Sequence, residues 1–475
     1  MLSLGIRFLS GMKMPQKMLL IAVIFLVPIA YLLVVYERNL NSQIEFTQLE
    51  IDGVRQIEPA RKIIQSMQLH RGVSQLALAG NEGAKAKLVD IKAQVAAAIE
   101  EQNKVDEVLG RVFNTKEEWK KLRSEWQALA AKAETLAAPE SFKSHTAVIA
   151  LAQDFIILTA DRSNMTLDPD LETFYLIDAF ATKIIRATEF SGQMRAMSVR
   201  SLQSGAISTE DRMELAVLAR LIGRDQADID IGLDKVGQVN ADAKLALAAP
   251  RQALKGAFDT YLKLVQAEVI SPEVPQGDPA NMLKVASGAI DAAYAMNDVA
   301  RTEFKRLAGE RVDRLKSERL RSIVAVGIAL LVVFYLFLAF RSSLITAIQA
   351  IAGMARRMAG GDFSQAAHVK SSDEMAEIAR ELNTTQSSLR DKIEAERVIA
   401  QANLRIKNAL DVSSTNVMVA DTDGNIIYCN TSVMAMLRNA ESDIRGQLPD
   451  FRADAVLGSN FDRFHRNPSH QRNLL

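Results

Sequence analysis

The stretches MLLIAVIFLVPIAYLLVVY, Met18–Tyr36, and SIVAVGIALLVVFYLFLAF, Ser322–Phe340, decide the fold of this chain. Each run holds 19 residues without Asp, Glu, Lys or Arg. A helix of that length, rising about 1.5 Å per residue, crosses a hydrocarbon core of roughly 30 Å. Two crossings leave the residues between them on one side of a membrane and both ends of the chain on the other. The layout predicts a mainly α-helical protein whose residues 37–321 form one extramembrane domain.

The charges around the first run predict its orientation. Arg7, Lys13 and Lys17 precede it without any acid, whereas Glu37 follows it. Positively charged flanks stay in the cytoplasm, so residues 1–17 are expected inside, and residues 37–321 outside, in the periplasm or extracellular space. The basic cluster at 311–321 lies on the predicted outer side, but it ends a long translocated domain, where the charge rule loses force.

A cleaved signal peptide is the alternative reading of the first run. The run is long for that purpose, Pro28 interrupts it, and no small-x-small cleavage site follows Tyr36. A retained anchor in a bacterial inner membrane is therefore favoured, with the lipid bilayer as a partner.

Composition excludes several classes of function. Lys+Arg and Asp+Glu are equal at 57 each, so no overall basic field favours nucleic acid. The single cysteine, Cys429, excludes an intramolecular disulfide or a cysteine-cluster metal site. The five histidines are scattered without zinc spacing, and no phosphate loop, nucleophile elbow or H-E-x-x-H pattern is present. We expect no enzyme activity, no metal and no nucleic-acid partner.

The segment 37–321 has helical periodicity interrupted by clusters of Gly, Pro, Asp, Asn and Ser. The clearest helix start is Asp168-Pro169-Asp170, which reads as an N-cap with proline at the first helical position. About eight helices are expected, more than one bundle holds, and we predict two stacked four-helix bundles that share long helices. The expected breaks fall at Gly80–Gly83, Phe113–Thr115, Ala137–Ser141, Asp168–Asp170, Ser204–Thr209, Gln238–Ala243 and Ser271–Pro279.

Two arginines of this domain are candidate ligand residues. The apolar stripe from Ala60 to Leu78 includes Arg71 and, one position later on the stripe, Ser74. An arginine facing a bundle core is costly unless an anion meets it. Arg195 follows Ser191-Gly192, which leave room one turn below it. Either the two guanidinium groups clamp a small anion, or Arg71 pairs with an internal acid or extends its charged end to solvent, and Arg195 is a surface charge.

The segment Gln68-Leu69-His70-Arg71-Gly72-Val73-Ser74 resembles the E-R-G-x-S signature of helical nitrate/nitrite-sensing domains in bacterial receptors. The segment from Asp161 to Asp178 is similar to a second region of that group. The resemblance implies a long helical bundle between two membrane spans, with arginines holding an anion. Arg71 corresponds by motif and Arg195 only by approximate position. His70 stands where the family usually has Glu, so the expected ligand is a small anion or organic acid rather than nitrate in particular.

Residues 341–394 carry two heptad stripes, separated by the helix-breaking Gly360-Gly361-Asp362. Two short helices of this kind cannot bury their seams alone, which predicts a parallel homodimeric four-helix coil; packing within one globular domain is the alternative. Gly361-Asp362-Phe363 and Asp373-Glu374-Met375 resemble the conserved points of a HAMP domain, although Ala347 and Ala376 depart from its usual proline and glycine. The stripes are Leu344, Ile348, Ile351, Ala355, Met358 and Met375, Ile378, Leu382, Thr385, Leu389.

The helical pattern continues through a signalling-helix linker, residues 395–410, into residues 403–475. There, two short β-runs joined by Asp423-Gly424 predict a hairpin, followed by the helix Ser432–Arg438. This region resembles the opening of a PAS domain of bacterial chemoreceptors, and the tail 458–468 matches those receptors. Such an α/β fold needs more residues than remain, so a truncated PAS module, and hence a fragment, is expected. His465 could ligate haem, but we predict an ordinary polar residue and no cofactor.

Together these patterns predict a methyl-accepting chemoreceptor, in its input half, that senses an external ligand and relays the signal as a homodimer. The resemblance implies cytoplasmic kinase and adaptor proteins as partners. The alternative is the sensor half of a histidine kinase or diguanylate cyclase, because both classes reuse these modules. A purely structural or adhesive membrane protein is disfavoured by the HAMP resemblance.

Overall fold

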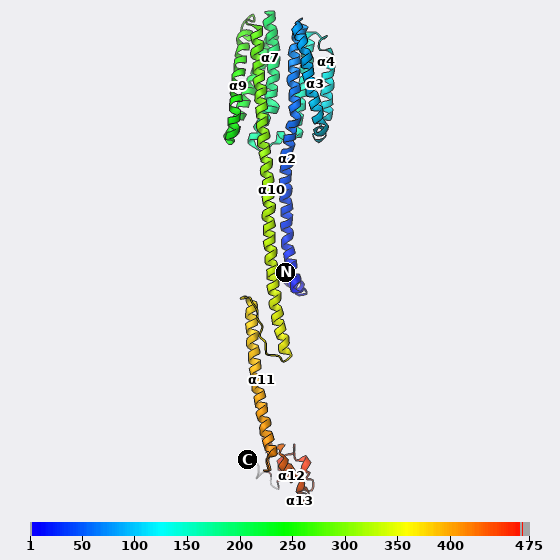
Figure 1. Cartoon of the computed structure of the whole chain (residues 1–475), viewed down its shortest axis with the longest axis vertical. Coiled ribbons are helices and arrows are strands. Elements are labelled where there is room, and N and C mark those ends of the chain that lie inside the picture. The colour runs from blue at the N-terminus through cyan, green and yellow to red at the C-terminus, as the bar shows by residue number, and fades with distance from the viewer. Residues whose placement is uncertain (1, 466–467, 469–475) are drawn as a thin grey trace. The chain divides into compact units, whose positions relative to one another are not determined.

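The computed structural model describes residues 2–465 and 468, and most of them are helical (Figure 1). They divide into two compact units, residues 19–329 and residues 1–18 together with 330–475. The helices of the first unit are α2 (Met14–Leu78), α3 (Glu82–Val112), α4 (Lys116–Lys132), α5 (Ala138–Arg162), α6 (Leu171–Ile177), α7 (Ile184–Ser204), α8 (Thr209–Val239), α9 (Ala241–Val265) and α10 (Pro279–Ala359), with the short turns η1 (Met165–Leu167), η2 (Asp178–Lys183) and η3 (Gln266–Ile270).

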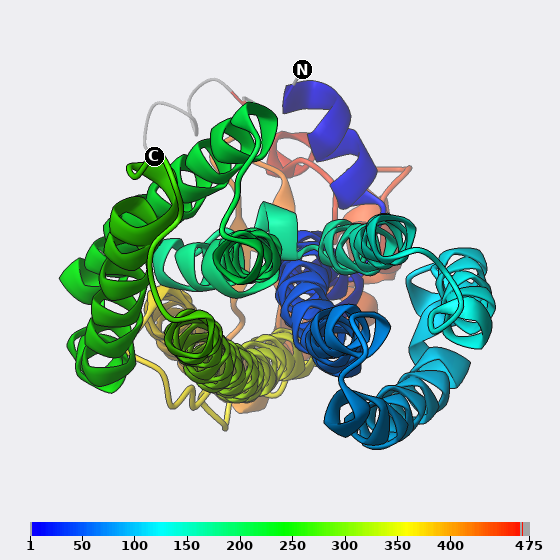
Figure 2. The same ribbon diagram turned by 90° about the horizontal axis from the view of Figure 1, so that it is seen from above.

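Two groups of antiparallel helices make up this unit. In Figures 1 and 2, α2, α3, α4 and α5 (blue to cyan) lie beside α7, α8, α9 and α10 (green). A single apolar core runs through both groups, from Ile57 and Trp126 to Phe180 and Phe258. The predicted stacking is therefore replaced by a side-by-side arrangement, because apolar faces of α2, α7 and α10 pack into one shared core.

The helix boundaries follow the predicted breaks. Asn81, Ser208 and Asn240 each accept a hydrogen bond from a backbone N–H of the helix that they precede, as N-cap residues do. The prediction for Asp168-Pro169-Asp170 needs a correction. Asp170 is the residue before α6, and the carboxylate of Asp168 instead accepts the N–H of Asp170 at 2.8 Å.

Within the described residues, α2 and α10 are the two helices long and apolar enough to cross a membrane. These helices include the predicted runs 18–36 and 322–340, and almost none of the most apolar 18-residue stretch of either helix, its apolar window, is buried. Both windows continue directly from helices of the bundle, so movement of α2 or α10 in the bundle reaches these segments without an intervening loop.

The second unit contains α1 (Leu2–Ser10), the end of α10, α11 (Glu374–Val412) and a small C-terminal module. Gly361, at φ +83°, ends α10 in the left-handed region that favours glycine. A short core around Met354, Ala367 and Ala379 joins α10, the connector and α11. Side chains of the predicted seam stay exposed in this single chain: Ile348 by 42%, Ile378 by 47% and Leu389 by 40%.

The C-terminal module has the predicted hairpin, β1 (Met418–Ala420) and β2 (Ile426–Cys429), paired antiparallel. Gly424 has φ +88° at its turn. The helices α12 (Thr431–Asn439) and α13 (Glu441–Arg445) follow, with the turns η4 (Ala453–Ala455) and η5 (Phe461–Phe464). Tyr428 donates to the carboxylate of Asp411 at 2.6 Å, which ties the hairpin to the end of α11. The predicted match 458–468 includes residues 466–467, which lie outside the described residues.

Candidate ligand site in the helical domain

Arg71 lies on α2 and points into the interface with α7. Its side chain is 1% exposed and forms a two-pronged ion pair with Glu189, at 2.5 Å to Oε1 and 3.2 Å to Oε2. It also donates to Thr146 Oγ1 at 2.9 Å. A bidentate guanidinium–carboxylate pair is among the strongest charged contacts in proteins. The structure therefore pairs Arg71 with an internal acid, which is one of the alternatives that the sequence left open.

Glu189 is fully occupied by protein donors. Besides Arg71, it accepts from Gln68 Nε2 at 3.0 Å and from Gln193 Nε2 at 2.7 Å. Gly192 lets α7 approach this pair, since a Cβ there would lie 2.9 Å from Nη2 of Arg71. We expected the space beside Gly192 to accommodate Arg195, but the guanidinium of Arg71 occupies it. A free anion cannot reach Arg71 without displacing Glu189.

Arg195 lies one turn further along α7 and is in a different situation. The residue is buried, at 9% exposure, and its guanidinium donates to Ser287 Oγ on α10 at 3.0 Å. Gly72 on α2 gives it room, because a Cβ there would lie 3.3 Å from Nη2. Burial lowers the pKa of the Arg195 guanidinium, and the nearby positive charge of Arg71 acts in the same direction. Arginine stays charged in proteins all the same.

A cavity of about 860 Å³ opens beside Arg195. It lies where the end of α2 and the start of α10 meet α3, α5, α7 and α8, at the bundle end furthest from the apolar windows of α2 and α10. Arg200 pairs with Asp211 at 3.1 Å across part of its lining. The apolar part of the lining includes Leu69, Val73, Leu76, Phe142, Met197 and Leu283. Such a mainly apolar hollow with a few polar groups is the usual form of a small-molecule site.

The three predicted site residues therefore separate. Arg195 lines the cavity, so its reading as a surface charge is wrong. Arg71 lies behind Phe142, whose ring is 5.1 Å from its guanidinium carbon, and Arg71 is absent from the cavity lining. Ser74 is buried and lies 3.3 Å from Nδ1 of His70, also away from the cavity. A clamp made by both arginines is not what the structure contains.

Sequence reasoning missed Glu189, Ser287 and Phe142. Glu189 had a signal, since Ile185, Glu189 and Gly192 repeat at helical spacing on the buried face of α7. An acid on such a stripe matches the arginine on the stripe of α2. Ser287 and Phe142 carried no comparable signal, because their place beside Arg195 depends on how separate helices pack.

Polar side chains continue from the Arg71–Glu189 pair along the contact between α2 and α10. Gln68 Oε1 accepts from the hydroxyl of Tyr294 at 2.7 Å. The ring of Tyr294 lies 5.3 Å from the guanidinium carbon of Arg61. Arg61 is nearly buried and lies 3.4 Å from a carboxylate oxygen of Asp298. The polar contacts thus pass from the neighbourhood of the cavity to α10.

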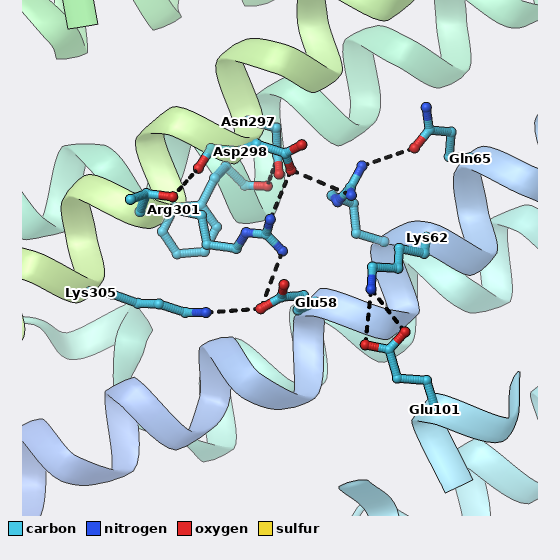
Figure 3. Close-up of polar contacts among 11 residues, drawn as sticks. Glu58, Lys62, Gln65, Glu101, Asn297, Asp298, Arg301 and Lys305 are labelled. Atoms are coloured by element: carbon cyan, nitrogen blue, oxygen red, sulfur yellow. Dashed lines mark hydrogen bonds and ion pairs between the residues drawn. The ribbon is translucent and has the colours of Figure 1, made fainter. Parts of the chain in front are cut away.

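Figure 3 shows the next part of this contact, where side chains of α2 and α10 point toward one another. Arg301 contacts Asp298 at 2.8 Å and Glu58 at 3.8 Å, and Lys305 contacts Glu58 at 2.8 Å. Asn297 donates to the backbone oxygen of Phe180 at 2.6 Å. Charged pairs between two helices fix their register, so these contacts set how α10 lies along α2.

Metal and cofactor candidates are weak among the described residues. No group of three or more His, Cys, Asp or Glu side chains there is arranged to hold a metal ion. His465 bonds through Nδ1 to the backbone oxygen of Phe461 at 2.9 Å.

Comparison with known proteins identifies two modules. Residues 339–391 match the HAMP domain family, and residues 404–468 match a PAS domain family. A stretch of 103 residues is 50% identical to the methyl-accepting chemotaxis protein McpB of Pseudomonas aeruginosa, and this covers 21% of the present chain and 15% of that protein. The chain therefore carries HAMP and PAS domains and is related, over this stretch, to a chemotaxis protein.

Among solved structures, that of the NasR transcription antiterminator aligns with 74% of this chain and 98% of its own, at 16% identity and a TM-score of 0.45. A likeness of this size does not establish a common fold for the helical domain. The predicted resemblance to nitrate-sensing domains remains a prediction.

Proposed function

We propose that this chain is the sensing and relay part of a methyl-accepting chemoreceptor that binds an organic acid in the cavity beside Arg195. The observation that carries the proposal is the order of parts. A helical domain with a buried arginine at a cavity leads, through α10, into an apolar window and then a HAMP domain. The 50% identity to a chemotaxis protein supports this output over a histidine kinase or diguanylate cyclase.

The ligand class follows from the size and lining of the cavity. A volume of about 860 Å³ far exceeds that of a small inorganic ion, and it falls within the range of roughly 300–1,000 Å³ usual for organic ligands. Arg195 offers a buried guanidinium group that forms no ion pair within 4.0 Å among the described residues, although the charge of Asp291 acts on it from farther away. The carboxylate of the ligand would bind Arg195, and its apolar part would lie against Leu76 and Phe142.

The signal would travel through α10, with the relay acting as a dimer. The exposed seam of Ile348, Ile378 and Leu389 supports pairing with a second copy, because one chain leaves these side chains in water. A ligand that favours one arrangement of α10 against α2 would shift the HAMP domain between two packings. In this proposal the protein lies in a bacterial inner membrane, with residues 37–321 outside, and cytoplasmic kinase and adaptor proteins receive the output.

The test uses the full chain in lipid nanodiscs and a thermal-shift panel of aliphatic and aromatic carboxylic acids, each paired with its neutral amide. We expect at least one acid to raise the unfolding midpoint while its amide does not. Arg195→Gln should abolish that shift, and Arg200→Gln, at the cavity rim, should keep most of it. Equal shifts from acids and amides, or a shift that survives Arg195→Gln, would contradict the proposal.

A further inference from the structure

A second buried charge cluster lies at the other end of the helical domain, around Arg311 of α10. Its guanidinium contacts Glu50 of α2 at 3.1 Å, Asp168 at 2.9 Å and Asp170 at 2.7 Å. It also donates to the hydroxyl of Thr173 at 2.6 Å. One arginine therefore joins α2, the loop before α6, α6 itself and α10.

The charges of this cluster do not balance. Three carboxyl groups face a single guanidinium, and the side chains of Glu50 and Asp168 are both 0% exposed. Asp170 is 40% exposed and remains in contact with solvent. With every acid ionised, the buried part alone would carry one uncompensated negative charge. Burying an unpaired charge costs several kcal/mol, and proteins commonly avoid the cost by neutralising the group.

Two buried oxygens of the cluster lack a donor. Oε2 of Glu50 and Oδ1 of Asp168 face Arg311, whereas Oε1 of Glu50 and Oδ2 of Asp168 have no hydrogen-bond partner. A buried acceptor without a donor destabilises the fold, because it has lost its hydrogen bonds to water. The uncompensated charge and the unfilled acceptors have the same remedy, which is one hydrogen placed on this pair of acids.

We propose that this cluster is a proton-binding site, in which Glu50 holds one proton at neutral pH and shares it with Asp168. The protonated Glu50 donates a hydrogen bond to one oxygen of Asp168. The other oxygen of Asp168 pairs with Arg311, as does the exposed carboxylate of Asp170. The site then binds α2, the loop and α10 together without excess charge. It is separate from the cavity beside Arg195 and does not depend on the ligand proposed there.

The groups that face Glu50 agree with this assignment. Burial, and after it the negative charge of Asp168, raise the pKa of Glu50 to about 9, although Arg311 acts in the opposite direction. Asp170 adds a further negative charge from the loop. Thr47 of α2 and Thr173 of α6, the hydroxyl groups of the cluster, are neutral at every pH of interest.

The site makes the packing of α2 against α10 depend on pH. The folded pKa of Glu50 lies above its unfolded value of 4.5, so the folded state holds the extra proton between these values. The resulting stability is fully present below about pH 4.5 and declines as the pH rises toward 9, beyond which the cluster holds two buried anions. Alkaline conditions therefore loosen the contact between the two helices that enter the apolar windows.

Infrared difference spectra of the full chain in nanodiscs, recorded between pH 7 and pH 10, test the proton directly. The wild type should lose a protonated-carboxyl band as the pH rises. Glu50→Gln should lack that band, and Glu45→Gln, an exposed acid on the same helix, should keep it. A band that persists in Glu50→Gln, or its absence from the wild type, would overturn the proposal.

Unfolding measured between pH 7 and pH 9 gives a second readout. One proton lost on unfolding raises the unfolding equilibrium constant about tenfold per pH unit, and Glu50→Gln should remove this contribution while Glu45→Gln keeps it. Asp168→Asn should reduce it, because Glu50 then loses the negative charge that, after burial, raises its pKa most. Glutamine reproduces a protonated acid, so a Glu50→Gln variant that fails to fold at pH 7 would also contradict the site.

Discussion

The two ends of the helical domain bury opposite excesses of charge. Near the cavity, Glu189 forms an ion pair with Arg71, whereas Arg195 donates a hydrogen bond to Ser287. Near the apolar windows, Glu50, Asp168 and Asp170 share one base, Arg311. At the first end Arg195 lines a cavity, where we propose that it binds an anion; the second end is buried, and we propose that it binds a proton. The contrast indicates that an unbalanced buried charge identifies the partner that it lacks, and that access decides whether the partner is a ligand or a proton.

Arg71→Ala should have the largest effect on stability. Removing one partner of a buried pair leaves Glu189 charged without its counterion, which costs about 3–5 kcal/mol. Denaturation of the unliganded full chain measures this loss. Glu189→Gln in the Arg71→Ala background should restore much of the stability. A midpoint that stays the same or rises in Arg71→Ala would mean that Arg71 is the unpaired charge of this end, and would break the comparison.

The buried histidine pair should make the cavity end sensitive to acid. Burial lowers the pKa of His70 to about 3 and that of His145 to about 4, and their rings are hydrogen-bonded at 2.8 Å. The unfolded chain binds protons below about pH 6.5 while the folded pair does not, so stability falls as the pH drops from 6.5 toward 4. The expected slope is about 1.4 kcal/mol per pH unit for each histidine.

Thermal unfolding from pH 7 to pH 4 measures this loss of stability in acid. His145→Gln should reduce the slope of stability against pH by about half. His368→Gln, at an exposed position of the connector, should leave that slope unchanged. A pH dependence that His145→Gln does not alter would show that other groups cause it. Between pH 4.5 and pH 6.5 Glu50 contributes a pH dependence of opposite sign, so these variants are compared in a Glu50→Gln background.

Charged substitutions in the HAMP seam should have the smallest effect at the cavity. Ile351 and Leu382 pack around the short core that joins α10 to α11, far along the chain from Arg195. Ile351→Glu or Leu382→Glu should lock or abolish signalling, whereas the ligand affinity of the chain should change little. Kinase-control assays in the intact receptor, together with ligand titration of the same variants, measure both quantities. Unchanged signalling would contradict the proposed relay.

The helices, their breaks and the two modules after α10 were predictable because they depend on local patterns. Apolar runs, Gly361 and the Asp423-Gly424 turn act within a few residues of chain. The side-by-side arrangement of the two helix groups was not predictable from the sequence. Helices that form one shared core and helices that form two stacked cores carry similar apolar stripes, so the stripes do not distinguish the two arrangements. The arrangement depends on which faces of α2, α7 and α10 meet.

The candidate site was predicted in part. Arg71 was identified because it interrupts an apolar helix stripe, and Arg195 because Ser191 and Gly192 leave room one turn below it. Which of them has a partner depends on Glu189, Phe142 and Ser287, which come from three other places in the sequence. A stripe on one helix shows that a charge is buried, and only the packing of a second helix shows what meets it.

Calorimetric titration of the full chain with the acid that gives the largest thermal shift tests the central claim most directly. Arg195→Ala should remove a charge-assisted contact of about 1.5–3 kcal/mol, roughly a ten- to hundredfold loss of affinity. It should also leave the stability of the unliganded chain equal or higher, since an unpaired buried charge is gone. Arg200→Ala should bind within a fewfold of the wild type. Wild-type affinity in Arg195→Ala would contradict the assignment of the cavity as an anion site.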